Sequence, residues 1–468
     1  MAAAVACATN PATGQRQLSF MSEEKEIALG QENDAQVRRE MGSYDDRALQ
    51  EYITGVGMKL AMVSERPNLP WRFTVADVPA VNAFALPGGY IYITRGILPF
   101  LDDESQLAGV LGHEIGHVTA RHAASQYSKS TLSQVGLLAT AILAPGGAAI
   151  AQGGGTGLGL LLLKNGRDDE AQADGLGVRY ASRAGWDPAG VPRMLTTLGR
   201  IEETSDSKGV PNWLETHPQP DDRVQRVQAA VRDAENGAQR FTTDHDGYLK
   251  HITGIVWGDS PDQGIVRGGS FFHKGLRIAV DFPAGWPIQN GQTQVVAKES
   301  GGRSMIMLEP VRRPGRTVED TAIITMQNAG FRQVDGGPTA VNGLQGYAGT
   351  YVGVLQSLGR VQMRALFVRN DRSTYLLAGV APIDSYPSMS ATFSKSLESF
   401  RALTAADAER LRPNRIELYT TKQGDTWQGL AEHQSHGIIK ATTLAIMNGH
   451  PVNDQPAPGE RLKIVVGD

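Results

Sequence analysis

One short stretch constrains this chain more than any other, because its residue types and their spacing suit a single kind of chemistry. Residues 111–117 read Leu-Gly-His-Glu-Ile-Gly-His. In an α-helix, residues four apart lie on one face, so His113 and His117 can direct their imidazoles at one metal ion. Glu114 lies about 100° further around the helix, close enough to reach a water on that metal without binding it. The spacing predicts a helix that carries a metal-dependent hydrolytic centre.

The residues around this stretch favour a helix. Asp103 and Glu104 supply acidic groups for a first turn, and no proline interrupts residues 104–124. Gly112 and Gly116 lower the helix propensity, which suggests that something packs tightly against this helix, such as a sheet or the metal site. The alternative is a solvated helix whose two histidines match the motif by chance.

A centre with two histidines needs a third protein ligand. A third histidine directly downstream is excluded, because the matching positions are Ala120 and Ala123. A glutamate on a second helix is the other common solution, and Glu170 and Asp174 are four apart on one predicted helical face. Glu170 can bind zinc while Asp174 accepts a hydrogen bond from the outer nitrogen of a ligating histidine. The alternative is an ordinary charged surface.

Four ordered stretches together resemble the M48 family of zinc metallopeptidases. They are residues 81–96, residues 113–117, the pair Glu170 and Asp174, and Thr216, His217 and Pro218 followed by Arg223. The resemblance covers about residues 10–230. It implies one Zn²⁺ per chain, held by His113, His117 and Glu170, with Asp174 behind them. It also implies that a metal-activated water hydrolyses peptide bonds, with Glu114 as its general base.

Two further candidates for the catalytic machinery follow from the last of these stretches. His217 has three interpretations: a loop histidine that caps the next helix, a hydrogen-bond donor to the transition state, or an inhibitory fourth zinc ligand. The resemblance favours a position near the metal. Arg223 either stabilises the oxyanion or pairs with a carboxylate.

The same resemblance implies a substrate-binding strand. It makes Asn82, Ala83, Phe84 and Ala85 an edge strand that pairs with the backbone of an extended substrate, whereas the alternative is a plain hairpin. Pairing through the backbone would let the enzyme hold unfolded or misfolded proteins with little sequence preference.

The chain has one cysteine, Cys7, so no intramolecular disulfide is possible. Its surroundings resemble a bacterial lipobox, although only six residues precede it and the signal peptide looks truncated. A lipid there would anchor the protein to a membrane of the cell envelope, on the periplasmic side. The alternative is a free thiol in an N-terminal tail.

Residues 125–163 contain two apolar runs that glycines interrupt. Neither run reaches the roughly 20 residues that a membrane span needs. We expect a helical hairpin or a mobile lid near the active site, with an apolar face for substrate or a membrane surface.

Composition and pattern predict an α+β multidomain chain. It has 468 residues, 41% of them hydrophobic, and its net charge of -4 gives no basic surface for nucleic acid. We expect a tail over residues 1–19, a mainly helical zincin-type peptidase domain with a small β-sheet over 20–245, an α+β accessory domain over 246–404, a linker over 405–415 and a small LysM-like βααβ module over 416–468.

The accessory domain shows no catalytic constellation, so a binding or positioning role is expected. The last module resembles LysM modules in residues 424–427, 444–448 and 458–464. Such modules bind glycans that contain N-acetylglucosamine, often peptidoglycan. The alternative is a purely structural βααβ cap.

Together these patterns predict a zinc-dependent endopeptidase for unfolded or misassembled cell-envelope proteins. The competing hypothesis is an envelope chaperone or scaffold that binds unfolded proteins and peptidoglycan, with latent or self-inhibited protease activity. An intact set of ligands and base favours the enzyme, because a pure binder does not need Glu114.

Overall fold

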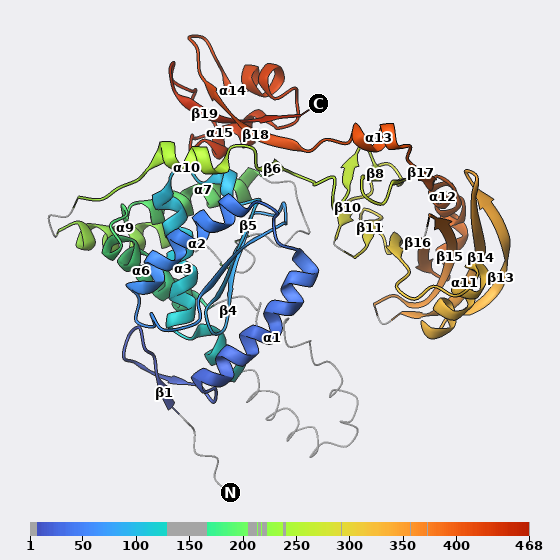
Figure 1. Ribbon diagram of the computed structural model, residues 1–468, viewed down its shortest axis with the longest axis horizontal. Helices are drawn as coiled ribbons and strands as arrows, with labels where there is room; N and C mark the ends of the chain where they lie inside the picture. The colour runs from blue at the N-terminus through green and yellow to red at the C-terminus, as the bar shows by residue number, and fades with distance from the viewer. Residues whose placement is uncertain are drawn as a thin grey trace, which may run out of the picture. The chain divides into compact units, whose positions relative to one another are not determined.

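The computed structural model describes residues 7–128, 166–204, 213, 217, 222–236, 240–291, 293–355, 357–371 and 373–467. By their contacts, these residues form two compact units, one of residues 1–257 with 414–467 and one of residues 258–413. Helices and sheets are mixed in both units (Figure 1). The C-terminal segment therefore belongs to the same unit as the predicted metal centre.

Most helices of the described residues belong to the first unit. Its elements are β1 (Cys7–Thr9), β2 (Arg16–Leu18), α1 (Glu23–Met41), α2 (Arg47–Met62), β3 (Arg72–Ala76), β4 (Ala83–Leu86), β5 (Tyr90–Thr94), η1 (Leu98–Phe100), α3 (Glu104–Thr119), α6 (Arg167–Arg183), α7 (Gly190–Thr204), α9 (Arg223–Glu235), α10 (His245–Ile252), β6 (Val256–Trp257), β18 (Asn414–Thr420), α14 (Trp427–Gly429), η3 (Leu430–Gln434), α15 (Ala441–Met447) and β19 (Arg461–Val466).

The predicted motif helix is α3, and local signals fix its start. The side chain of Asp103 caps it by accepting the backbone N–H of Gln106 at 3.0 Å. Every residue from Ser105 to Thr119 is buried, which excludes the solvated helix that the sequence left as an alternative.

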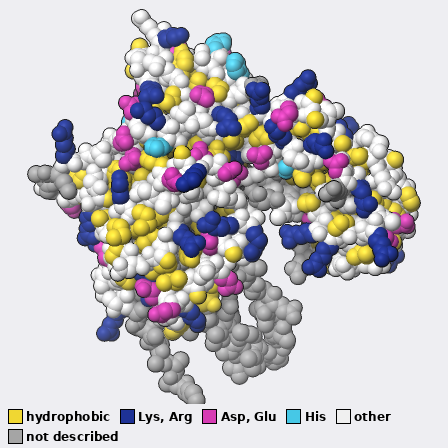
Figure 2. Space-filling view, viewed as in Figure 1, with side chains coloured by type: hydrophobic (Ala, Val, Ile, Leu, Met, Phe, Trp, Pro, Cys, Tyr) yellow, Lys and Arg dark blue, Asp and Glu magenta, His cyan; other side chains and the backbone are white. Residues whose placement is uncertain are grey.

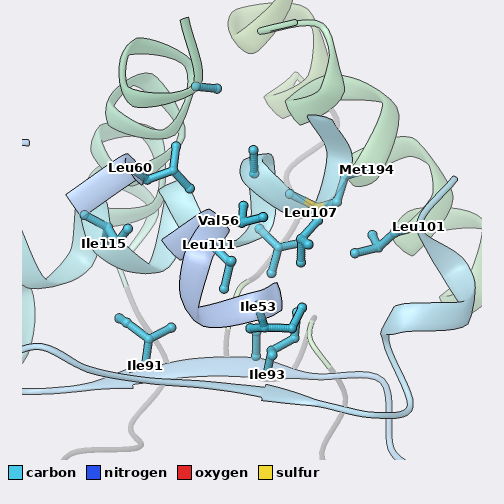
Figure 3. Packing of buried hydrophobic residues seen from close by; sticks show 14 of the residues in the cluster. Ile53, Val56, Leu60, Ile91, Ile93, Leu101, Leu107, Leu111, Ile115 and Met194 are labelled. Atoms are coloured by element: carbon cyan, nitrogen blue, oxygen red, sulfur yellow. The ribbon is translucent and has the colours of Figure 1, made fainter. Parts of the chain in front are cut away.

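The core around α3 is a layer of apolar side chains between helices and a small sheet. β3 and β5 run parallel, β4 pairs antiparallel with β5, and the strand order is β3-β5-β4. In Figure 3, Ile91 and Ile93 of β5 point toward α2 and α3, where Ile53, Leu111 and Ile115 meet them. This packing holds α3 in place.

The C-terminal segment packs into the first unit through a small sheet and a buried cation. β18 pairs with β19 and with β6, and Phe100 lies in the apolar cluster of this segment. Nζ of Lys463, fully buried, donates to the carbonyl of Leu101 at 2.7 Å and to Asp102 Oδ1 at 2.8 Å. The segment thus contacts the residues directly before α3.

The second unit is built on one large antiparallel sheet. Its elements are β7 (Ile265–Arg267), β8 (Ser270–His273), β9 (Ile278–Asp281), β10 (Ile288–Asn290), β11 (Val295–Lys298), β12 (Met305–Pro310), α11 (Val318–Asn328), β13 (Arg332–Val341), β14 (Leu344–Leu355), β15 (Gly359–Asn370), β16 (Ser373–Pro382), α12 (Tyr386–Glu398), β17 (Arg401–Ala402) and α13 (Ala405–Glu409).

Two apolar clusters cover the two faces of this sheet. The larger sheet has the order β10-β11-β12-β16-β15-β14-β13. Successive residues of a strand point to opposite faces, so Leu366 joins the cluster that contains Phe393 of α12, and Phe367 joins the cluster that contains Met326 of α11. The unit has a core of its own.

Two expectations concern membranes. Among the described residues, no helix combines the length and the apolar character that a membrane crossing requires. The predicted lid falls mostly on residues 129–165, which lie outside the described residues.

On the face of the molecule that Figure 2 shows, positively and negatively charged side chains are interspersed.

Candidate metal centre

The metal centre is possible because α3 and α6 cross at very short range. An added Cβ on Gly112 of α3 would lie 3.2 Å from the Cα of Gly177 in α6, and one on Gly116 would lie 3.0 Å from the carbonyl oxygen of Ala173. The sequence predicted that something packs tightly against α3 at these glycines, and the partner is a second helix. The close crossing carries Glu170 to the two motif histidines.

Four metal-binding side chains converge near this crossing. His113 Nε2 lies 3.0 Å from His117 Nε2 and 3.2 Å from His217 Nδ1. Oε1 of Glu170 lies 3.3 Å from His117 Nε2 and 3.0 Å from His217 Nδ1, while its Oε2 lies 3.5 Å from His113 Nε2. The donor atoms of the four residues all lie within 4.8 Å of one another, and all four residues are buried.

These separations fit a metal ion. A tetrahedral zinc ion with ligands at about 2.0–2.1 Å keeps its donor atoms about 3.3–3.4 Å apart. The measured separations range from 3.0 to 3.5 Å. Imidazole nitrogens with one carboxylate also suit zinc chemically. The residues present therefore fit the predicted cofactor.

Asp174 and Arg223 form a buried layer behind the ligands. Asp174 Oδ1 lies 3.0 Å from His113 Nδ1, so that the outer N–H of the imidazole faces a carboxylate and its Nε2 lone pair faces the cluster. Arg223 donates to both oxygens of Asp174 at 2.7 and 2.8 Å, and its Nη2 lies 3.0 Å from Glu170 Oε2. Two roles were considered for Arg223, stabilising the oxyanion and pairing with a carboxylate, and the observed contacts are of the second kind.

Burial and pairing act on the pKa values of these groups in opposite directions. Burial lowers the pKa of His113 to about 3, so its imidazole is neutral, as a metal ligand must be. Burial raises the pKa of Asp174, but hydrogen bonds from His113 and Arg223 outweigh it and lower the pKa. For Glu170, burial is likewise outweighed by nearby histidines, His217 first, and the pKa falls far below its usual range.

Glu114 occupies the place expected of a general base. It is buried, and its Oε1 lies 3.5 Å from His217 Nε2. Burial raises the pKa of Glu114 to about 8. A carboxyl group with a pKa near neutrality can both accept and return a proton, which suits general acid-base catalysis.

The structure adds two residues that the sequence analysis did not single out. His122 is buried with its Nδ1 2.8 Å from His117 Nδ1, and burial lowers the pKa of His122 to about 4. Trp213 stacks on His217 with ring centroids 4.1 Å apart, and the His217 N–H donates to the Trp213 carbonyl at 2.8 Å. The sequence contained one signal for Trp213: it precedes His217 by four residues, a spacing that brings two side chains together on a helical turn.

The predicted substrate strand is the edge strand β4. Among the described residues, β4 pairs only with β5 in its sheet. The carbonyl of Asn82 accepts the backbone N–H of Thr94 at 3.0 Å, so by alternation the backbone groups of Ala83 and Ala85 face away from β5. The ring of Phe84 stacks on Tyr92. Cys7 lies in β1.

Two histidines one helical turn apart, a glutamate from a second helix and a buried glutamate beside them are typical of a class of metallopeptidases. The sequence pattern of peptidase family M48 matches residues 47–231, over α2 to α9. The chain belongs to this family.

Relatives of known name agree with the family. The chain is 32% identical over 226 residues to the beta-barrel assembly-enhancing protease of Escherichia coli, which covers 46% of each chain. It is 30% identical over 241 residues to the mitochondrial metalloendopeptidase OMA1 of Schizosaccharomyces pombe, which covers 50% of this chain and 68% of the relative. The chain thus spans about half the length of the bacterial relatives it matches.

Proposed function

We propose that the protein is a zinc-dependent endopeptidase that hydrolyses unfolded or misassembled proteins of the bacterial cell envelope. The observation that carries this proposal is the convergence of His113, His117 and Glu170 within reach of one ion, with the buried carboxyl group of Glu114 beside them.

The chemistry divides between the ion and the protein. Zinc bound by His113, His117 and Glu170 would act as a Lewis acid for the scissile carbonyl and for the attacking water. Glu114 takes a proton from that water and delivers it to the departing amine. Asp174 orients His113. We assign to Arg223 the role of offsetting the negative charges of Asp174 and Glu170, the two carboxylates that it contacts.

For His217 we propose the inhibitory role. Its Nδ1 completes a set of four donor atoms, whereas a catalytic zinc site keeps one position open. The backbone N–H of Trp213 donates to the carbonyl of Val81 at 2.9 Å, at the end of the substrate strand. His217 thus occupies a coordination position of the metal, and Trp213 occupies a backbone position next to the substrate strand. Both residues must move away before a substrate binds.

The proposed substrates follow from the edge strand and from the name of the bacterial relatives. A strand that recognises backbone alone accepts extended chains of many sequences. The relatives are called beta-barrel assembly-enhancing proteases. We therefore place the substrates among unfolded envelope proteins, in the periplasm.

We further propose that residues 416–468 are a LysM-like module that binds peptidoglycan, and that Cys7 carries a lipid that anchors the protein. The order β18, α14, α15 and β19 supports the first assignment, because it follows the βααβ pattern of such modules. The second rests on the sequence around Cys7 alone.

Cleavage of unfolded casein by the zinc-loaded full chain tests the proposal. Wild type should cleave, and Glu114→Gln should retain zinc but lose activity by about 10²–10⁴-fold, the usual contribution of a general base. His217→Ala should be more active than wild type if His217 inhibits. Loss of activity in His217→Ala would instead assign it to the transition state. Zinc binding without cleavage by any variant would contradict the endopeptidase and favour a binding protein.

A further inference from the structure

The two motif histidines differ in what supports their outer nitrogens. His113 has a carboxylate, Asp174, at 3.0 Å. His117 instead has a second histidine: its Nδ1 lies 2.8 Å from the Nδ1 of His122, whose exposed fraction is 3%. A hydrogen bond between two imidazole nitrogens needs one donor and one acceptor, so the tautomers of the two rings are linked.

A break in the helix creates this contact. On a continuous helix, residues five apart lie about 140° apart and do not face each other. α3 ends at Thr119, and Arg121 adopts the left-handed conformation with φ of 60°. The Arg121 side chain is held by Glu26 Oε2 at 2.9 Å and by the carbonyl of Met21 at 2.6 Å. The turned chain brings His122 back to the motif helix.

A chain of hydrogen bonds fixes which nitrogen of His122 carries its proton. The backbone N–H of Ala12, which can only donate, bonds to Asn10 Oδ1 at 2.9 Å. The other atom of that amide, Asn10 Nδ2, must therefore be a donor, and it bonds to Gln172 Oε1 at 3.0 Å. The same oxygen lies 2.8 Å from His122 Nε2.

The donor-to-acceptor direction of these hydrogen bonds decides the tautomer of His117. Because Gln172 presents an oxygen, His122 must carry its proton on Nε2 and offer the Nδ1 lone pair. His117 must then carry its proton on Nδ1, which leaves its Nε2 lone pair directed at Glu170 and the ligand cluster. This is the tautomer that a ligand binding through Nε2 requires.

We infer that His122 is a positioning residue of the metal centre, and that Asn10 and Gln172 set its orientation. The inference rests on the proposed metal site. It also makes the N-terminal hairpin, in which β1 and β2 flank Asn10, part of the support of that site. Asp174 supports His113 with a charged carboxylate, whereas the group in contact with the outer nitrogen of His117 is a second imidazole, and Asp169 Oδ1 lies 3.7 Å from the far nitrogen of that imidazole, His122 Nε2.

Metal affinity and ring tautomer together test the inference on the full-length protein. Zn²⁺ and Co²⁺ affinities are measured by competition with a chelator, and the tautomer of His117 by ¹⁵N NMR of the imidazoles in the metal-free protein. His122→Leu, which removes the acceptor, should weaken metal binding about 10–100-fold, the usual cost of losing such a partner. It should also lose the preference for the proton on His117 Nδ1.

Matched variants separate positioning from general damage. His122→Asn keeps an acceptor near the position of Nδ1 and should retain most of the affinity. His251, which stacks on Tyr52, provides the control His251→Gln with wild-type affinity. If His122→Leu does not fold, the metal affinities of Gln172→Leu and Gln172→Glu are compared instead. The carboxylate of Gln172→Glu can still accept a hydrogen bond from His122 Nε2, whereas the leucine of Gln172→Leu cannot form one.

Two results would overturn the inference. One is wild-type metal affinity and an unchanged His117 tautomer in His122→Leu, and the other is equal affinity in Gln172→Leu and Gln172→Glu. A folded wild type that binds no metal would instead overturn the proposed function, so the two failures are distinguishable.

Discussion

The metal centre of the first unit and the sheet of the second unit are stabilised by opposite means. Glu114, Glu170, Asp174 and Arg223 are each at most 2% exposed. In the second unit the described ion pairs lie at the surface, as for Arg277 and Asp371, whose side chains are 48% and 65% exposed. Charged side chains are buried at the metal centre, whereas the described buried side chains of the second unit are apolar or uncharged polar ones, such as Phe393 and Thr321.

This difference shows what determines each architecture. Buried charges cost free energy unless they are paired, and three carboxylates face a single arginine at the centre. If Glu114 holds its proton, Glu170 and Asp174 still exceed Arg223 by one negative charge, which a bound divalent cation would more than offset. The second unit needs no such compensation, because Phe393 and its neighbours supply its stability by apolar burial.

The largest expected effect on stability comes from removing the buried cation. Arg223→Met leaves Asp174 and Glu170 without their partner and should lower the free energy of unfolding by about 3–5 kcal/mol. Urea denaturation followed by tryptophan fluorescence reports mainly the first unit, which contains all the tryptophans but Trp286. A loss below about 1 kcal/mol, the scale of a surface pair, would contradict the account.

Metal removal should act on one unit only. At a free zinc concentration of 100 times Kd, binding stabilises the folded protein by about 2.7 kcal/mol, so chelation should lower the Tm of the first unit by roughly 4 °C. The second unit, which has no metal-binding cluster among its described residues, should melt unchanged. Scanning calorimetry with and without chelator checks this, and equal shifts of both transitions would break the comparison.

The pH dependence of the metal-free protein isolates Glu114. Burial raises its pKa to about 8, above the ordinary value near 4.3, so the folded state holds a proton that the unfolded chain has lost. The free energy of unfolding should therefore fall as pH rises between these values, by at most about 1.4 kcal/mol per pH unit. Glu114→Gln has no titratable carboxyl group at this position, so its free energy of unfolding should not show this fall. Parallel curves for the two proteins would show that Glu114 is not buried as described.

The smallest effect is expected in the second unit. Arg277→Ala breaks the 2.6 Å pair with Asp371, but both side chains are largely exposed. The free energy of unfolding should change by less than about 1 kcal/mol, and salt should reduce even that. A loss comparable to that of Arg223→Met would remove the distinction between the two regions.

The sequence was sufficient where chemistry follows local periodicity. His113 and His117 share a face of one helix, as do Glu170 and Asp174 of another, and both helices form as expected. His122 could not be predicted, because its contact with His117 depends on the left-handed turn at Arg121.

The second unit shows the same limit for strands. β13 contains Asp335, Gly336, Gly337 and Pro338, residue types that favour a turn over a strand. It pairs with β14 through a two-residue turn at Asn342 and Gly343, both with positive φ. That Asn-Gly pair is a strong hairpin signal, and it was the information available in the sequence.

The most direct test of the central claim is the zinc content of the purified, folded full-length protein by elemental analysis. The account predicts about one zinc per chain in wild type and in Glu114→Gln, because Glu114 is not a ligand. It predicts much less in Glu170→Gln, which loses the carboxylate between the histidines. A folded wild type without zinc, or a Glu170→Gln variant that retains a full complement, would contradict the metal centre described here.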